Sequence, residues 1–475
     1  MRILLTGCVA ISLALASCAS KKNSVTPNNN TPAKTDVAFW MTKGDRSVLL
    51  QKQDIALNFG SAANTHKTIT VDENQTYQSI DGFGYTLTGG SATLINQLPE
   101  QEKDALLKEL FATEGNAVGI SYLRVSIGAS DLSAKVFTYN ELPAGQTDVN
   151  MERFSIAEEM TDLVPVLKRI LAINPSIKIL GSPWTPPTWM KTNKAYKGGS
   201  LLPEFYQAYA NYFVKYIDAM KAQGITIDAI TIQNEPLHPG NTPSLLMLAK
   251  DQAEFIKTAL GPTFQKAGIK TKIILYDHNA DRPDYPMSIL ADAEASKYVD
   301  GSAFHLYGGK IDALSQVHDA YPDKHIYFTE QWVGGPGNFA EDLKWHVSTL
   351  IVGATRNWSR NVLEWNLAAD ANYNPHTPDG GCTNCLGALT IAPAITRNVA
   401  YYVIAHASKF VRPGSVRINS SADNTLSNVA FKTPDGKKVL IVMNTSNTNQ
   451  TFNISDKGKI VTPTLPAGAA ATFVW

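Results

Sequence analysis

The stretch Ala229–Leu237, AITIQNEPL, decides the fold assignment of this chain. It begins with Ile230-Thr231-Ile232, an apolar and β-branched run that is typical of a buried strand. Pro236 lacks the N–H that a sheet requires, and it therefore ends the strand. Glu235 is thus placed at the end of a buried strand, where a carboxylate has no packing role. The stretch Ile326–Glu330, IYFTE, repeats the pattern and also ends in a glutamate.

Strands of this kind alternate with segments of helical period through most of the chain. In Pro203–Met220, for example, aromatic and apolar side chains recur three and four residues apart. Eight strand–helix units predict an α/β fold, a closed (β/α)8 TIM barrel over residues 81–409. A doubly wound sheet is the alternative, but no glycine-rich phosphate loop follows any expected strand. The expected strands are Gly82–Leu87, Ile120–Ile127, Ile177–Trp184, Ala229–Glu235, Lys272–Asp277, Gly301–Tyr307, Ile326–Glu330 and Asn361–Trp365.

Strand-rich segments flank the expected barrel on both sides. Residues 36–80 contain short runs such as Val48–Leu50 and Thr68–Val71. Residues 410–475 contain further strands, separated by turn signals such as Pro434–Lys437. Repeated short strands are typical of a β-sandwich. We therefore expect one β-sandwich, attached to the barrel and built from the N-terminal strands of 36–80 and the C-terminal strands of 410–475.

The first residues indicate export. Arg2 is followed by the short apolar stretch Ile3–Ala16, and Leu15–Cys18 resembles a bacterial lipoprotein box. We expect residues 1–17 to be a lipoprotein signal peptide, Cys18 to carry lipid, and residues 18–35 to be a flexible tether. A plain secretory signal, with Cys18 present by chance, is the alternative. The lipid anchor would hold the protein at the membrane of a bacterial cell envelope, on either face of the outer membrane.

Composition excludes several classes of function. The chain has 475 residues with 42 Lys+Arg and 42 Asp+Glu, so its formal net charge is zero. A nucleic-acid-binding protein is usually basic. No HExxH motif occurs and the nine His show no ligand spacing, so we expect no metal and no cofactor. Cys382 and Cys385 form an isolated CxxC, which in an exported protein favours a small disulfide that pins a loop over a zinc site.

Polar and aromatic side chains collect where the expected strands end. In a (β/α)8 barrel the carboxyl ends of the strands build the active site. Each residue alone has a structural alternative, because tryptophans pack in cores and arginines pair with carboxylates. Their accumulation at one end of the barrel nevertheless favours a substrate site. The candidates are Arg124, Asp131, Trp184, Asn234, Glu235, His305, Tyr307, Glu330, Trp332 and Trp365.

A facing pair of glutamates suggests hydrolysis of a glycosidic bond. One carboxyl group must be protonated so that it can give a proton to the leaving oxygen. The other must be ionised so that it can attack the anomeric carbon. Glu235 and Glu330 follow strands three apart in the expected barrel, which suits the separation of about 5–5.5 Å in retaining enzymes. Asn234 can hydrogen-bond a sugar 2-hydroxyl, and Tyr307 can hydrogen-bond the ionised nucleophile.

These residues resemble glycoside hydrolase family 30, the group that includes lysosomal glucosylceramidase and microbial endo-β-1,6-glucanases. The matching motifs run in family order over nearly the whole chain after the export signal. The most specific of them is Ser182–Asn193, SPWTPPTWMKTN. The others are Gly82-Phe83-Gly84, Arg124-Val125, Ser130–Ser133, Gln233–Pro236, His305–Tyr307, Thr329-Glu330 and Glu364–Leu367.

The resemblance implies roles for individual residues. Glu235 would be the acid/base and Glu330 the nucleophile, and the first glucosyl unit would contact Asp131, Trp184, Asn234 and Trp365. The resemblance also implies a barrel with a β-sandwich built from both chain ends. The chain departs from the family's glucosylceramidases at three places that would line the leaving-group side. These are Thr88–Gly90, where those enzymes carry an acidic residue, Gln331-Trp332, and the loop of Cys382 and Cys385.

We therefore expect a retaining β-glycoside hydrolase with a carbohydrate substrate. An endo-β-1,6-glucanase is favoured, because a lipoprotein of the bacterial envelope would meet a β-glucan more readily than a ceramide. A glucosylceramidase or exo-β-glucosidase is the alternative among enzymes. An inactive glycan-binding lipoprotein is the alternative of another class, although such a protein has no need for both glutamates.

Overall fold

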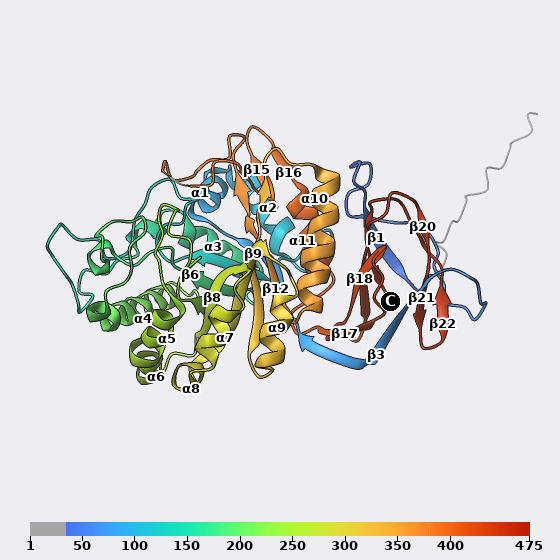
Figure 1. The fold of residues 1–475 in the computed structure, drawn as a ribbon. Helices are drawn as coiled ribbons and strands as arrows, with labels where there is room; N and C mark the ends of the chain where they lie inside the picture. Colours follow the sequence, from blue (N-terminus) through green and yellow to red (C-terminus); the bar gives the residue numbers. More distant parts are fainter. Residues whose placement is uncertain (1–34, 380) are drawn as a thin grey trace, which may run out of the picture. The chain divides into compact units, whose positions relative to one another are not determined.

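The computed structural model describes residues 35–379 and 381–475 (Figure 1). The expected signal peptide of residues 1–17, the expected lipid site Cys18 and nearly all of the expected tether lie outside the described residues. Among the helices that are described, none combines the length and the apolar character needed to cross a membrane.

Parallel strands close into a barrel, which confirms the expected α/β fold class. They follow one another around the ring in chain order, and the last strand, β12, pairs with the first, β4. The doubly wound alternative is thereby excluded, because an open sheet has two edges. The barrel strands are β4 (Gly82–Thr86), β5 (Tyr122–Ser126), β6 (Lys178–Ser182), β7 (Ala229–Thr231), β8 (Lys272–Ala280), β9 (Val299–Gly309), β10 (His325–Glu330) and β12 (Ser359–Asn366).

Side chains fill the inside of the barrel as a packed layer. Large and small residues from successive strands together fill this layer, so that a barrel of this size has a packed core and not a pore. Helices cover the outer surface and bury its apolar face. The inner layer consists of Tyr122, Leu180, Ala229, Ile274, Ala303, Tyr327 and Leu363.

The outer helices begin and end close to the amphipathic segments of the sequence. The segment expected at Pro203–Met220, for example, forms a 3-10 turn over Pro203–Phe205 and the helix α4 over Tyr206–Ala222. The helices are α1 (Gly89–Gln97), α2 (Glu100–Phe111), α3 (Leu163–Ile173), α4, α5 (Ala249–Phe255), α6 (Gly261–Ala267), α7 (Asp284–Leu290), α8 (Ala293–Ser296), α9 (Ala313–Ala320), α10 (Phe339–Trp345) and α11 (Val399–Ser408). Two π-helical segments, Ile256–Leu260 and His346–Ala354, continue α5 and α10.

Both flanks of the barrel contribute to one nine-stranded sheet, in the order β2-β1-β24-β19-β18-β17-β3-β21-β22. In Figure 1 the blue strands β1 and β3 lie among the red strands of the chain's end. The strands are β1 (Ala38–Thr42), β2 (Gln51–Lys52), β3 (Thr68–Ser79), β17 (Val416–Ser420), β18 (Leu426–Lys432), β19 (Lys438–Asn444), β21 (Asn453–Asp456), β22 (Lys459–Val461) and β24 (Ala470–Val474). The pair β20 (Gln450–Thr451) and β23 (Thr464–Leu465) completes this part.

One expected strand is wrong. Val48–Leu50 lies in the turn between β1 and β2, because Arg46 and Leu50 adopt positive φ angles of 63° and 48° that no strand allows. The backbone N–H of Leu50 donates instead to the Thr42 hydroxyl at 2.9 Å. A short apolar run alone does not distinguish a strand from a tight turn.

A buried histidine joins the barrel to the sheet. His406, on α11, contacts the Thr472 hydroxyl of β24 through Nδ1 and the Thr42 hydroxyl of β1 through Nε2, each at 2.9 Å. Its side chain is fully buried. Three segments far apart in the sequence therefore meet at one imidazole.

Candidate active site

A cavity of about 700 Å³ opens at the carboxyl ends of the barrel strands. A second cavity, of about 510 Å³, lies at the opposite end beside Tyr122 and Tyr327. The first is the candidate site, because barrel enzymes place their chemistry at the carboxyl ends of the strands. It is lined by Asp131, Glu235, Leu237, His238, Asn241, His278, Asn279, Leu306, Tyr307, Glu330, Gln331, Trp332, Trp365, Gly381, Cys382 and Cys385.

Glu235 lies four residues beyond the end of β7, in a turn that aims its side chain into the cavity. Its φ is 45°, an uncommon conformation for a residue that is not glycine. The backbone N–H of Glu235 donates to the carbonyl oxygen of Asp277 at 3.0 Å, which holds the turn on β8. Backbone strain of this kind concentrates at functional sites.

Glu330 is the last residue of β10, and its carboxylate is held by two donors. Arg124 Nη1 lies 2.6 Å from one oxygen, and the hydroxyl of Tyr307 donates to the other at 2.9 Å. The Arg124 side chain is fully buried and that of Glu330 is 7% exposed. A permanent cation and a phenol thus both stabilise the ionised form of Glu330.

The two glutamates face each other across a short gap. One carboxylate oxygen of Glu235, one of Glu330 and a ring nitrogen of His305 all lie within 4.8 Å of one another. This spacing is close to the separation of about 5–5.5 Å that allows a covalent glycosyl-enzyme. The same three groups could ligate a metal ion, but Arg124 beside Glu330 opposes a second cation there.

Asp277 connects the strands beneath both glutamates, and the sequence did not single it out. One of its oxygens accepts from Arg124 Nη2 at 2.8 Å, and the other lies 3.0 Å from His305 Nε2. It has no exposed side-chain surface. Asp277 also accepts hydrogen bonds from the hydroxyl groups of Ser182, Thr231 and Thr329. Its position at the end of the expected strand Lys272–Asp277 was the available signal, but the sequence around a single Asp does not show which residues will be its partners.

Charged neighbours determine whether Glu235 or His305 carries the proton between them. Burial alone would raise the pKa of Glu235, but contacts from His278 and His305 outweigh it and lower the pKa. Burial would lower the pKa of His305, but the carboxylates of Glu330, Asp277 and Glu235 raise it to about 9. The proton between His305 Nδ1 and Glu235, which are 3.3 Å apart, therefore lies on the histidine in the free site.

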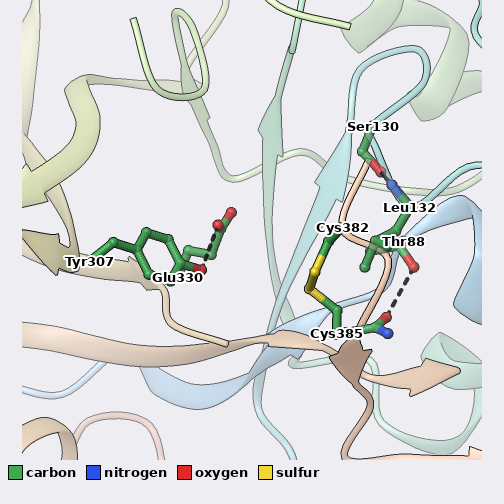
Figure 2. The surroundings of a disulfide bond; sticks show 8 residues. Thr88, Ser130, Leu132, Tyr307, Glu330, Cys382 and Cys385 are labelled. Carbon is green, nitrogen blue, oxygen red and sulfur yellow. Dashed lines mark hydrogen bonds between the residues drawn. A yellow bond between two sulfur atoms is a disulfide. The ribbon is translucent and has the colours of Figure 1, made fainter. Parts of the chain in front are cut away.

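An aromatic wall stands behind the glutamates. Trp184 and Trp365 stack with ring centroids 5.4 Å apart, and the Arg124 guanidinium lies 4.9 Å from the centroid of Trp184. Leu132 and Cys385 complete this cluster, and Trp332 packs against it. The disulfide between Cys382 and Cys385 packs against this wall. Figure 2 shows the disulfide, with Glu330 and Tyr307 on the other side of the view.

Asp131 lines the cavity close to both glutamates. Burial, together with the negative charges of Glu330 and Glu235, raises the pKa of Asp131 to about 7. A backbone hydrogen bond from Cys382 acts in the opposite direction and favours the carboxylate. Asp131 is 6% exposed, so a ligand in the cavity can reach it.

The structure separates the remaining candidates into two groups. Trp332, Trp365 and Tyr307 line the cavity with the acidic residues, whereas four candidates lie behind them. Among these four, Asn234 accepts from Arg124 Nη2 at 2.6 Å. The group behind the cavity surface is Arg124, Trp184, Asn234 and His305, each no more than 5% exposed.

Sequence reasoning missed the loops that rim the cavity. His238 and Asn241 come from the loop after β7, and His278 and Asn279 come from β8. No motif distinguishes these polar residues from those of any exposed loop. The only signal in the sequence is that they lie close to or beyond the carboxyl ends of β7 and β8.

Comparisons with known proteins agree with this architecture. The model of the glycosyl hydrolase family 30 TIM-barrel domain matches residues 80–411, and the model of that family's beta sandwich domain matches residues 414–473. An endo-1,6-beta-D-glucanase of Neurospora crassa is 34% identical over 407 residues, which cover 80% of this chain and 82% of the relative. The lysosomal acid glucosylceramidase of Mus musculus is 29% identical over 436 residues, which cover 86% and 83%.

A solved structure extends the similarity to the whole fold. The structure of the endo-beta1,6-glucanase BT3312 matches with a TM-score of 0.85 and 37% identity, covering 93% of this chain and 99% of that one. Because family models cover both parts of the fold and a relative above 30% identity spans most of it, this chain belongs to glycosyl hydrolase family 30 and is a glycosyl hydrolase.

Proposed function

We propose that this protein is a retaining endo-β-1,6-glucanase in which Glu235 is the acid/base and Glu330 the nucleophile. The observation that carries the proposal is the approach of the two carboxylates to within 4.8 Å at the ends of β7 and β10. That distance leaves no room for a water molecule between Glu330 and a bound sugar, so attack by the carboxylate itself is favoured.

The reaction takes two displacements. Glu330 attacks the anomeric carbon, the glycosidic C–O bond breaks, and the leaving oxygen takes a proton from Glu235. A water molecule then gives a proton to Glu235 and attacks the anomeric carbon, which releases Glu330 as a carboxylate. Two inversions return the β configuration.

In the free site the pKa shifts of the two glutamates run opposite to these catalytic roles. The conflict is resolved because the charge beside Glu330 is permanent and the charge beside Glu235 is not. Burial raises the pKa of Glu330, although His305 and Arg124 oppose this, while the pKa of Glu235 is lowered. The low pKa of Glu235 depends on a histidine charge, whereas the Arg124 charge beside Glu330 is permanent. Transfer of one proton from His305 Nδ1 to Glu235 gives the form that acid catalysis needs.

The substrate class is inferred from relatives. The Neurospora crassa relative and the solved BT3312 are both named as endo-1,6-glucanases, at 34% and 37% identity. Where glucosylceramidases of the family carry an acidic residue, this chain has Thr88, which caps α1 by accepting from the Ser91 N–H. Glucosylceramide is the second candidate, favoured by the 29% identity to the mouse glucosylceramidase.

A product profile tests the substrate. The purified protein is incubated with linear β-1,6-glucan, with a β-1,3-glucan, and with glucosylceramide in detergent, and the products are separated by length. We expect a ladder of β-1,6-linked oligosaccharides from the first substrate alone. Release of glucose only would indicate exo action, and cleavage of glucosylceramide with an intact glucan would favour the second candidate.

We further propose that Cys18 is lipidated and anchors the protein to the bacterial envelope, at the outer membrane. The support is the match of Leu15–Cys18 to a lipoprotein box. In a bacterial host fed a labelled fatty acid, the wild-type chain should carry label and sediment with membranes. The Cys18→Ser variant should lose both properties, and a labelled Cys18→Ser chain would contradict the proposal.

A further inference from the structure

The disulfide between Cys382 and Cys385 belongs to the wall of the active-site cavity. Cys385 is 2% exposed and packs with Trp184 and Trp365, and both cysteines line the cavity. Figure 2 places the bond beside the loop that contains Leu132. A cystine in this position contacts the site itself and does more than brace a distant loop.

One side of the disulfide is tied to the segment that follows the nucleophile. Cys385 begins β14 (Cys385–Leu386), which pairs antiparallel with β11 (Val333–Gly334), so that Gly334 stands opposite Cys385. The N–H of Gly335 also donates to the carbonyl oxygen of Asn384 at 2.7 Å. The strand β11 comes directly after Gln331-Trp332, so this ladder restrains the chain just beyond Glu330.

The other side of the disulfide is tied to Asp131. The backbone of Cys382 is near enough to the Asp131 carboxylate to favour its ionised form. The N–H of Thr377 donates to the carbonyl oxygen of Asp131 at 2.7 Å, and a Cβ placed on Gly381 would come within 2.9 Å of that same oxygen. The loop therefore lies directly on the backbone and the carboxylate of Asp131.

We propose that the segment Cys382–Cys385, closed by its disulfide, is a positioning element that holds Asp131 in the geometry needed to bind the glycone. The inference rests on the proposed function, because Asp131 acts here as a ligand of the sugar. The cystine itself need not touch the sugar, because it acts on Asp131 through the loop that it closes.

Asp131 depends on such a partner because it is buried among acidic groups. Glu330, Glu235 and the hydroxyl of Tyr307 face it across the cavity, and the first two disfavour its ionised form. A disulfide limits the conformations of the short loop that lies against Asp131. Without this restraint the loop moves away, and Asp131 loses its charge or its position.

A double-mutant cycle tests the inference on an aryl β-gentiobioside, whose good leaving group reports on glycone binding. Cys382→Ser/Cys385→Ser should lower kcat/KM by about tenfold or more in the wild-type background, since small displacements of a positioned group carry costs of this size. In an Asp131→Asn background the same change should lower kcat/KM by less than about twofold, because its target is already disabled.

The matched control is Thr383→Ala, which lies between the two cysteines, has an exposed side chain and retains the disulfide. It should keep the wild-type kcat/KM. Equal losses in both backgrounds would mean a general structural role and would overturn the proposal, as would wild-type kinetics of the double serine variant. Activity of the wild-type enzyme is measured first, so failure of the proposed function is seen separately.

A second variant covers the case in which the double serine protein does not fold. Gly381→Ala keeps the disulfide but crowds the carbonyl oxygen of Asp131 and the hydroxyl of Thr377. It is placed in the same cycle. We expect it to lower kcat/KM in the wild-type background and to have little effect in the Asp131→Asn background. Additive effects of Gly381→Ala and Asp131→Asn would contradict the inference.

Discussion

Glu330 is positioned by Arg124 and Tyr307, and its replacement by Gln removes only the charge that attacks the sugar. We expect Glu330→Gln to lower kcat by at least about a thousandfold on any β-glucoside, since the covalent route is lost. The glutamine can still accept from Arg124, so thermal unfolding should change little. Steady-state rates on β-1,6-glucan check this, and near wild-type turnover would exclude Glu330 as the nucleophile.

Asp277 should matter more for stability than for direct chemistry, because it compensates the buried charges of Arg124 and His305. We expect Asp277→Asn to lower the free energy of unfolding by about 3 kcal/mol, the order found when one partner of a buried ion pair is removed. Denaturant unfolding measures the change. The control Asp281→Asn removes an exposed carboxylate nearby and should leave stability unchanged; equal effects of the two variants would contradict the role given to Asp277.

Closure of the barrel depends on a glycine in its first strand. In β4, a Cβ on Gly84 would overlap the backbone oxygen of Tyr122 in the neighbouring strand β5. We expect Gly84→Ala to destabilise the protein by about 3 kcal/mol or more, because a backbone atom of a closed sheet cannot move aside. Gly60→Ala is the matched control, since nothing lies within 4 Å of its added Cβ. Comparable unfolding transitions for the two variants would show that β4 and β5 can separate at little cost.

The elements also show how far the sequence predicts the structure. Alternation of strand and helix predicted all the barrel strands within a few residues, because buried parallel strands are recognisable as short apolar runs. It placed Glu235 inside a strand, whereas β7 ends at Thr231 and a turn with positive φ carries the glutamate. Turns of this kind are fixed by tertiary contacts, here with Asp277, and leave no periodic signal.

On the scale of the whole molecule, His406 makes stability depend on pH. Burial lowers the pKa of His406 to about 3, while an unfolded chain has a histidine pKa of about 6.5. Below about pH 6.5 the unfolded state binds a proton at His406 that the folded state does not bind. The free energy of unfolding therefore falls as the pH drops from about 6.5 towards 3. His406→Gln should reduce this slope in thermal unfolding, whereas the exposed His66→Gln should not; an unchanged slope in His406→Gln would contradict the assignment.

The candidate site was predictable to the extent that its residues stand at strand ends. Glu235 and Glu330 do so within recognisable runs, and the structure brings their carboxylates together. Asp277 was missed because its importance comes from partners on five other strands. The contact between Cys382 and Asp131 was also inaccessible, since about 250 residues of sequence separate two loops that only the closed barrel brings together.

The measurement that tests the central claim most directly uses Glu235→Ala with an aryl β-gentiobioside and added azide. If Glu235 is the acid/base, Glu330 still forms the glycosyl-enzyme, water attacks it slowly, and azide restores turnover by attacking the same carbon. The predicted product is the β-glycosyl azide. An α-glycosyl azide would contradict the account, because it would mean a single displacement at a site whose missing nucleophile is Glu235.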